Sequence, residues 1–413
     1  MISIIVLACV FVLIAVRKLG NLHFQIWQVM SLGAVAVLVT GQISPLDALK
    51  AVNLDVLAFL LGMFVLGEAL ESSGYLSQLS YRIFSRTGSV DGLVLAVLFV
   101  MGTLSAFLMN DTLAIIGTPV VLVLARRTQA NSKVLLLSLA FAITIGSVAS
   151  PIGNPQNLLI ASSGGVKNPF LTFLNYLFVP TVINLFIAYL TVRLFYRRHF
   201  SSTQINHVAA AANDERLAGL CKISLIVLGT LILLKVGLVF AGSTFDFRLT
   251  YIALAAALPI AVFSPKRLTI IKNIDWYTLV FFAAMFVLMD SVWNSGIFQD
   301  ALSRTNLDLT AVPVILPVGT ILSQFISNVP LVALYQPLLA KLGVNTIGLM
   351  ALAAGSTIAG NLSIMGAASN VIIIQNAERK FGETLTFWEF VRIGAPLTAV
   401  NLLVYWGYFK IIG

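Results

Sequence analysis

Long apolar runs alternate with short polar connections along almost the whole chain. A helix that crosses a membrane needs about 20 mostly apolar residues, so each full-length run predicts one crossing. The first run lacks a basic start and an A-x-A site, so it predicts a first crossing rather than a signal peptide. The ten predicted crossings are residues 1–16, 22–40, 54–71, 134–162, 170–195, 219–241, 249–264, 275–293, 346–376 and 388–412.

Two further apolar stretches, residues 93–124 and 312–340, carry a polar cluster in the middle. Each is too short for two comfortable crossings. We therefore expect two re-entrant helical hairpins with tips near the membrane centre. Non-helical backbone at that depth must be covered by protein or line a water-filled cavity. The clusters are Asn110-Asp111-Thr112 and Ser327-Asn328-Val329-Pro330.

The two halves of the chain repeat the same landmarks in the same order, which indicates an internal duplication. Each half contains five crossings and one hairpin. Because five is odd, the second half must enter the membrane with opposite sidedness, as in inverted-repeat transporters. The matched landmarks are Met63-Phe64-Val65-Leu66, Glu68 and Ser73-Gly74 with Met285-Phe286-Val287-Leu288, Asp290 and Ser295-Gly296; Asn110 and Pro119 with Asn328 and Pro337; and Ser150, Gly153 and Asn157 with Ser363, Gly366 and Asn370.

These landmarks divide the chain into three parts. Residues 1–198 form the first repeat, with its hairpin at about 93–124 and a broken helix at about 134–162. Residues 199–218 form a polar linker. Residues 219–413 form the second repeat, with its hairpin at about 312–340 and a broken helix at about 346–376.

Composition supports an all-α polytopic membrane protein. Hydrophobic residues make up 59% of the 413 residues and charged residues 10%, with a mean hydropathy of +0.98. These values exclude a soluble enzyme, a disordered tail and a nucleic-acid-binding module. We interpret the net charge of +9 as a signal of orientation in the membrane and not as a nucleic-acid-binding surface.

Charge predicts the sidedness of the membrane crossings. With both termini outside and the linker cytoplasmic, 18 of the 25 lysines and arginines fall inside and 6 outside, while Lys235 lies within a crossing. This bias follows the positive-inside rule. We expect a multi-pass protein of a prokaryotic inner membrane.

The predicted broken helices contain the sequences TIGSVASPIGNPQN and GSTIAGNLSIMGAASN. Gly146, Pro151, Gly153 and Pro155 in the first, and Gly360 and Gly366 in the second, are expected to interrupt the helix. Exposed N–H ends suit an anion and exposed C=O ends suit a cation. The alternative is small-residue packing between helices. The candidate ligands are Ser150, Asn154, Asn157, Asn361, Ser363, Ser369 and Asn370.

Asp111 is the one acidic residue in the two tip clusters. A carboxylate at membrane depth costs roughly 2.5–3.5 kcal/mol, so it needs a partner or a function. We expect it to bind a coupling ion or carry a proton, with an N-cap of helix Leu113–Leu124 as the alternative. A sodium ion could lie near Asn110, Asp111 and Asn328. Structural or interfacial roles are expected for Glu68, Glu71 and Asp290, and a snorkelling position for Lys235.

Asn110-Asp111-Thr112 with Gly117-Thr118-Pro119, Ser327-Asn328-Val329-Pro330 and the P-I-G-N-P-Q-N stretch at 151–157 resemble the ion transporter superfamily. The chain looks most like arsenite permease-like proteins, with the divalent anion/sodium symporters and citrate carriers as cousins. The resemblance implies that the tip residues, together with the candidate ligands of the two broken helices, line the substrate and cation sites. The chain departs from the Ser-Asn-Thr tips usual in the symporters.

These features predict a secondary transporter of a small anion or oxyacid, with arsenite or antimonite efflux, coupled to Na⁺ or H⁺, as the leading case. A sodium-coupled carboxylate carrier, a sodium/proton antiporter and a channel are the alternatives. An enzyme is not expected, because the chain has no H-E-x-x-H motif and no Ser–His or paired-Asp arrangement at membrane depth. No cofactor, resident metal centre or nucleic acid is expected. The expected partners are the lipid bilayer and either a second copy of the chain or an energising ATPase.

Overall fold

The computed structural model describes residues 2–16, 18–19, 22–85, 87–162, 166, 168–200, 214–240, 248–297, 300 and 308–412. The regular secondary structure of this part of the chain is helical apart from two two-residue strands, β1 (Lys18–Leu19) and β2 (Leu22–His23), which pair antiparallel. The predicted all-helical fold is confirmed. Much of the 199–218 linker lies outside the described residues, and the helix that follows it begins at Glu215.

The first half consists of helices broadly at the predicted places. A π-helical turn, Val97–Met101, joins the two parts of the first hairpin's leading arm. A 3-10 turn, Arg197–His199, ends this half. The helices are α1 (Ile2–Val16), α2 (Ile26–Val39), α3 (Pro45–Ala51), α4 (Leu54–Ser72), α5 (Tyr75–Phe84), α6 (Val90–Ala96), α7 (Gly102–Leu108), α8 (Asn110–Thr128), α9 (Ser132–Ser147), α10 (Pro155–Ser162) and α11 (Pro169–Phe195).

The second half follows the same order. A 3-10 turn, Ile364–Gly366, lies inside its broken helix. The helices are α12 (Glu215–Phe240), α13 (Leu249–Phe263), α14 (Arg267–Asn273), α15 (Trp276–Asn294), α17 (Val312–Ile326), α18 (Asn328–Lys341), α19 (Thr346–Leu362), α20 (Ala368–Phe381) and α21 (Phe387–Ile412).

Matched elements of the two halves have matching geometry. The short helices α3 and α14 have seven residues each, and α4 and α15, which follow them, have nineteen each. Gly74 and Gly296, which end this unit, have φ angles of 76° and 72°. Glycine suits both positions because it adopts positive φ without steric cost. The halves also exchange partners, since α4 packs against α13 and α15 packs against α2.

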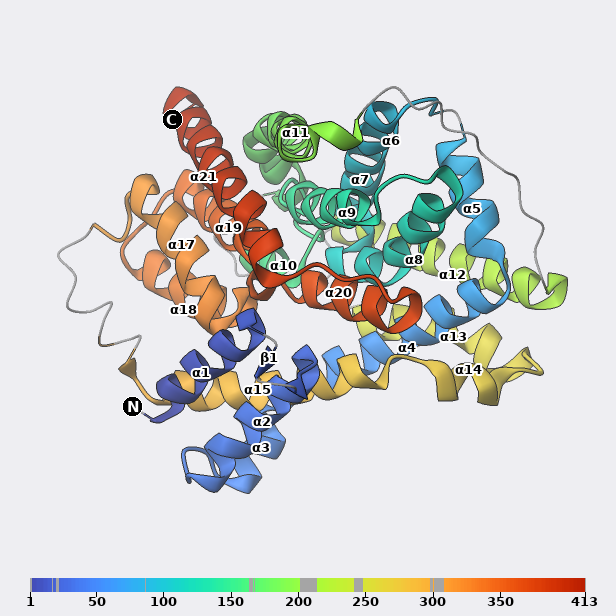
Figure 1. The fold of residues 1–413 in the computed structure, drawn as a ribbon. Helices are drawn as coiled ribbons and strands as arrows, with labels where there is room; N and C mark the ends of the chain where they lie inside the picture. Colours follow the sequence, from blue (N-terminus) through green and yellow to red (C-terminus); the bar gives the residue numbers. More distant parts are fainter. Residues whose placement is uncertain are drawn as a thin grey trace.

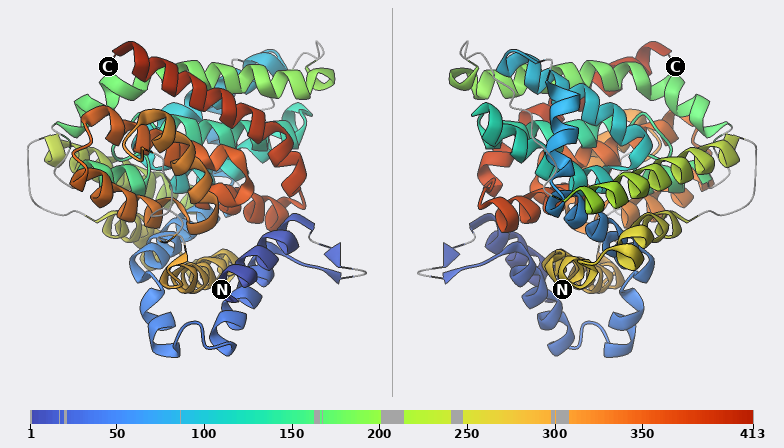
Figure 2. Two further views of the ribbon diagram at one scale, coloured as in Figure 1. Left: turned by 90° about the vertical axis from the view of Figure 1, so that its left-hand side faces the viewer. Right: turned by 90° about the vertical axis from the view of Figure 1, so that its right-hand side faces the viewer.

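The helices form two layers, seen one above the other in Figure 1 and from both sides in Figure 2. By their contacts, the lower layer contains α1–α4 and α12–α15 and the upper layer contains α6–α11 and α17–α21. Helix α5 packs against both α4 and α8 and joins the two layers. Within the upper layer each hairpin touches both halves. Its leading arm packs on the broken helix of its own half, α7 on α9 and α17 on α19. Its returning arm packs on the broken helices of both halves, α8 on α9 and α20, and α18 on α19 and α10.

The exposed surface of α11 is largely apolar. Along α11, side chains such as Leu171, Phe178 and Phe186 are about half exposed, while Asn184 on the same helix is fully buried. This inverts the pattern of a water-soluble protein and fits a helix packed in a bilayer. The chain is therefore a polytopic α-helical membrane protein.

The helices of the structure differ in length from the ten full-length crossings predicted from the sequence. Among the described residues, five helices are long and apolar enough to cross a membrane, or six if the bent pair α3–α4, with an angle of 52°, is one span. Several predicted crossings consist of shorter apolar helices, including α1, α2, α13, α9 and α19. Residues Val90–Phe107 pass the same length test, so the re-entrant path of the first hairpin remains a prediction.

The helix breaks are confirmed, but two glycines were wrongly expected to cause them. Gly146 lies inside α9 and Gly360 inside α19. Both glycines serve close packing. A Cβ atom at Gly146 would lie 2.1 Å from the carbonyl oxygen of Gly102, and one at Gly360 would lie 2.8 Å from Cβ of Ala367. We call residues 148–154 the first break and residues 363–367 the second break.

Candidate functional site

Each hairpin tip turns at a residue with a positive φ angle. Met109 (φ 64°) and Ser327 (φ 68°) stand directly before α8 and α18. Residues other than glycine rarely adopt this conformation, and such strain concentrates at functional sites. It brings Asn110 and Asn328 to the first position of the two returning arms, where both are more than nine-tenths buried.

Each tip contacts the break of its own half. The backbone N–H of Asn110 donates to the carbonyl of Gly153 at 3.0 Å. The side-chain amide of Asn328, oriented by its acceptor neighbours, donates to the carbonyl of Gly366 at 3.2 Å. The duplicated landmarks thus meet in space, tip against break, in both halves.

Glycine is required at both contact points. A Cβ atom at Gly153 would lie 2.2 Å from the carbonyl oxygen of Ser147, and one at Gly366 would lie 2.1 Å from that of Ala359. In each half, the break therefore folds back on the last turns of the helix before it. No larger residue fits without moving backbone.

Asn157 and Asn370 hold the breaks together. The sequence suggested both as ligands, but their amide nitrogens donate to the carbonyls that the interrupted helix leaves free. This occupies their donors and leaves their Oδ1 atoms for other contacts. The acceptors are the carbonyls of Ser147, Val148 and Ser150 for Asn157 (3.2, 3.3 and 3.1 Å) and those of Gly360 and Ser363 for Asn370 (2.5 and 3.3 Å).

The first break is also tied to the second half. Asn154 Nδ2 and Gln156 Nε2 donate to the hydroxyl of Thr357 on α19, at 3.2 and 3.4 Å. That hydroxyl donates in turn to Asn157 Oδ1 at 3.3 Å. Ser150 Oγ accepts from the backbone N–H two residues along. Thr357 was not predicted, although it follows Thr144 by the interval that separates Ser150 from Ser363.

The second break is supported from the second hairpin. Ser363 Oγ donates to Gln324 Oε1 at 2.7 Å. Beyond its contact with Gly366, the Asn328 amide reaches Ser323 Oγ and the carbonyl of Ser356, each at 3.2 Å. Gln324 was not predicted, because a glutamine within an apolar helix carries no motif.

Asn361 belongs to a different contact. Its Nδ2 donates to Asn401 on α21 at 3.0 Å, and Asn401 donates to Asn184 on α11 at 2.9 Å. This chain of buried amides joins α19, α21 and α11. The structure therefore connects Asn361 to a helix-packing network, and its predicted role as a ligand gains no contact with either tip among the described residues.

Asp111 lies in the first turn of α8, and the alternative that it is the N-cap is wrong, because the helix begins one residue earlier at Asn110 and Met109 is the N-cap. The carboxylate atom Oδ1 is buried and has no hydrogen-bond partner among the described residues. A negative charge in the first turn is favoured by the helix dipole. Asp111 is therefore the acidic group of the first tip.

Lys235 is buried at the junction of the layers rather than snorkelling to the surface, with 7% of its surface exposed. It lines a small cavity that includes Phe59 of α4, Phe107 of α7, and Met109 and Thr112 of the first tip. A buried lysine beside a hairpin tip places a positive charge near the site.

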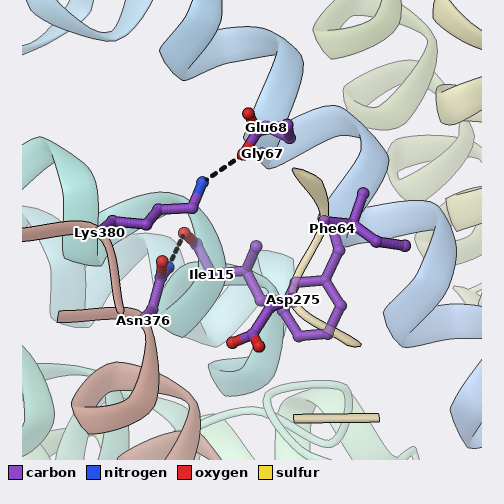
Figure 3. Close-up of a pocket in the computed structure, with 8 residues that line it drawn as sticks. Phe64, Gly67, Glu68, Ile115, Asp275, Asn376 and Lys380 are labelled. Atoms are coloured by element: carbon purple, nitrogen blue, oxygen red, sulfur yellow. Dashed lines mark hydrogen bonds and ion pairs between the residues drawn. The ribbon is translucent and has the colours of Figure 1, made fainter. Parts of the chain in front are cut away.

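An ion-pair cluster joins α20 to α4, and Figure 3 shows its pair of Lys380 with Glu68. Lys380 Nζ of α20 lies 2.8 Å from Glu68 Oε2 and 2.6 Å from Glu71 Oε2, both on α4. Beside it, Asn376 donates to the carbonyl of Ile115 at 3.3 Å. The structural roles expected for Glu68 and Glu71 fit this arrangement, whereas Lys380 was not singled out.

Apart from Asp111 and the neighbouring Lys235, the tip and break contacts are made by neutral amides, hydroxyls and peptide groups. No arginine or cysteine takes part in the tip and break contacts given above, and the described residues contain no group of three or more His, Cys, Asp and Glu residues that could hold a metal ion. Amides and hydroxyls can hydrogen-bond a ligand, but they do not form the bidentate charge clamp that an arginine provides.

Known proteins resemble this chain along most of its length. An uncharacterized transporter of Mycobacterium tuberculosis is 30% identical over 395 residues, covering 90% of each chain. A silicon efflux transporter of Oryza sativa subsp. japonica is 27% identical over 445 residues, covering 89% of each. The crystal structure of the Alcanivorax borkumensis YdaH transporter aligns with a TM-score of 0.47 and 17% identity, covering 99% of this chain and 96% of that one.

The family assignment follows from the sequence profile that matches residues 11–347, which is described as citrate transporter. This match confirms the resemblance to the ion transporter superfamily and the prediction that the chain is not an enzyme. Because the profile spans well over half of the chain, this protein belongs to the citrate transporter family and is a membrane transporter.

Proposed function

We propose that the protein is a secondary active transporter of a small oxyacid or oxyanion, with arsenite or antimonite efflux as the leading case. The observation that carries this proposal is the pair of tip-to-break contacts, Asn110 with Gly153 and Asn328 with Gly366. In each half the contact brings the start of a helix against an interrupted helix, and transporters with broken helices use such pairs of elements for substrate and coupling ions.

The chemistry of the site favours a weakly charged, hydroxylated substrate. Hydroxyl groups both donate and accept, which matches amides and serines better than a dianion would. Soft thiolate capture of trivalent arsenic is not offered, because Cys9 and Cys221 lie on α1 and α12, outside the contacts of the tips and breaks. The silicon efflux transporter of rice, a relative over most of the chain, supports a hydroxylated oxyacid.

Coupling to protons or sodium would involve Asp111. Its buried carboxylate oxygen without a described partner suits a proton carrier or a cation ligand. Alternating access would then move the hairpin-bearing upper layer against the lower layer. The cluster of Lys380 with Glu68 and Glu71 would open whenever that end of the pathway opens.

A carboxylate carrier is the second candidate. The family description and the buried Lys235 beside Met109 and Thr112 favour it, because a lysine can bind a substrate carboxylate. A sodium/proton antiporter would need no such organic substrate. A channel would carry its ion only downhill.

The test is transport by purified protein in liposomes. Arsenite, antimonite, silicic acid, citrate and succinate are supplied in turn, with a sodium gradient, a proton gradient or neither. We expect uphill movement of a hydroxylated oxyacid driven by one gradient, and loss of coupling in Asp111→Asn. Uphill citrate movement supports the carboxylate candidate, and movement that never exceeds equilibrium contradicts secondary active transport.

A further inference from the structure

Three exposed arginines lie where the end of α11 meets the start of α21. The guanidinium carbon of Arg392 on α21 lies 5.9 Å from the centre of the Phe195 ring, in the last turn of α11. Arg392 also acts electrostatically on Tyr196, which directly precedes Arg197 and Arg198 in the chain. All three arginines are exposed. We call Arg197, Arg198 and Arg392 the arginine corner.

No acidic side chain of the described residues neutralises the arginine corner. None of its three guanidinium groups forms an ion pair within that part of the chain. The sequence offers no local partner either, because residues 168–213 and 390–413 contain neither aspartate nor glutamate. Like charges that are not balanced repel one another and attract anions. The corner therefore calls for a negatively charged ligand.

The acidic residues that contact these two helices bind other cations. Glu389 of α21 pairs with Lys133 at 2.5 Å, and Asp91 of α6 pairs with Arg193 at 3.0 Å. The partial negative charge at the C-terminal end of α11 favours the two arginines that follow this helix. Arg392 lies near the N-terminal end of α21, where the helix dipole gives a cation no such support. Helix dipoles therefore do not account for the whole corner.

An apolar stripe on α11 leads to the arginine corner. Phe186, Leu190 and Leu194 follow one another at intervals of four residues, which places them on one face of the helix. They are 49%, 46% and 68% exposed on a helix long and apolar enough to cross a membrane. In a bilayer, acyl chains cover such an apolar face. A ligand that fits both the stripe and the corner has an anionic head and an apolar tail.

We propose that the arginine corner binds the phosphate headgroup of an anionic phospholipid whose acyl chain lies along the stripe of Phe186, Leu190 and Leu194. Guanidinium groups bind phosphate oxygens in a bidentate geometry. Basic groups at the cytoplasmic ends of membrane helices attract anionic lipid headgroups, and the positive residues predict that side for this end of α11. A free phosphate would satisfy the arginines and leave the stripe unused.

The lipid would join the ends of two helices that are also linked deeper in the upper layer. Two buried contacts connect α11 with α21, Thr181 with Tyr405 at 2.8 Å and Asn184 with Asn401 at 2.9 Å. A phosphate at the corner would remove the repulsion between guanidinium groups at one end of this helix pair. We therefore expect the lipid to stabilise the folded protein, whichever substrate is transported.

The experiment measures thermal unfolding of the purified protein in detergent as phosphatidylglycerol, phosphatidylcholine or inorganic phosphate is added at constant ionic strength. We expect phosphatidylglycerol to raise the Tm saturably and the other two to leave it nearly unchanged. Arg392→Gln should weaken the apparent lipid affinity about fivefold, and the triple change of the corner to glutamine should abolish the response. Lys222→Gln removes one exposed charge of α12 and should leave the affinity unchanged.

Two further variants test the apolar stripe. Leu194→Gln should weaken the response to phosphatidylglycerol, whereas Leu171→Gln, at the other end of α11 and 54% exposed, should not. Because all the replaced side chains are exposed, each variant should still unfold cooperatively without lipid. An equal rise in Tm with phosphatidylcholine or with inorganic phosphate alone overturns the proposal. Equal losses of affinity in Arg392→Gln and Lys222→Gln overturn it as well.

Discussion

The first break, residues 148–154, and the second break, residues 363–367, interrupt helices of similar length and use the same device to hold the chain. In both, an asparagine amide caps the free carbonyls and a glycine meets the tip of a hairpin. They differ in the side chains around that device. The first is closed by Asn154 and Gln156, whereas alanine and serine stand at the corresponding positions of the second.

This difference indicates that the two repeats keep the same backbone arrangement at the break, whereas the side chains around it have diverged. Capping carbonyls and fitting glycines are demands of the broken helix itself, so both halves meet them in the same way. Hydrogen-bond partners for the polar side chains within a break are a separate requirement, because either protein groups or a bound ligand can supply them.

The largest expected effect comes from Gly153→Ala and Gly366→Ala. Each adds a Cβ atom about 2 Å from a backbone oxygen, so we expect a loss of about 3 kcal/mol or more in stability and no transport. Gly229→Ala on α12 has open space around it and serves as the control. Normal transport in either break variant would contradict the close tip-to-break packing.

Lys380→Met should have the next largest effect. It leaves Glu68 and Glu71 without their buried partner, and we expect a loss of about 2–4 kcal/mol in thermal or denaturant unfolding. Lys50→Met, which breaks an exposed pair with Asp47, should change stability by less than about 1 kcal/mol. Adding Glu68→Gln and Glu71→Gln to Lys380→Met should restore part of the loss. If stability is not restored, unpaired carboxylate charge is not the cause of the loss in Lys380→Met.

Replacing the two capping asparagines compares the breaks directly. Asn157→Ala frees three carbonyls and Asn370→Ala frees two, so we expect losses of about 2–3 and about 1–2 kcal/mol. Unfolding in detergent measures both. A larger loss for Asn370→Ala would mean that the second break depends on its cap more than the hydrogen bonds suggest.

Asn361→Ala should have the smallest effect of this set. The side chain joins a packing network through Asn401, so we expect a loss of about 1 kcal/mol and an unchanged KM for the transported substrate. Asn110→Ala and Asn328→Ala should instead raise KM at least tenfold. Transport kinetics in liposomes measure the KM of each variant. A raised KM for Asn361→Ala would mean that Asn361 contributes to substrate binding.

Much of the fold could be predicted because a helix that crosses a membrane requires a long apolar run. Apolar runs located the crossings, and the repeated landmarks located both tips and both breaks. The short helices α3, α5 and α14 could not be found in this way, because seven to ten residues leave too weak a pattern. The prediction that Gly146 and Gly360 interrupt their helices was wrong, because a glycine in the sequence can indicate either a helix break or a close helix contact. Only the packing of the structure distinguishes these two roles.

The candidate site was predictable in place but not in detail. Residue types identified Asn157 and Asn370 as important, yet only geometry shows that their amides cap the backbone. Gln324, Thr357 and Lys380 contribute through partners more than 35 residues away, which no local motif records. Asn361 looked equivalent to its neighbours in sequence and faces a different helix.

The most direct test of the central claim is a cryo-electron microscopy map of the protein in lipid nanodiscs with and without antimonite, whose antimony atom scatters strongly. The account predicts added density in contact with both tips, beside Asn110 and Asn328, and between the two breaks. Added density only at the Lys380 cluster, or lipid filling the space between the tips, would contradict it.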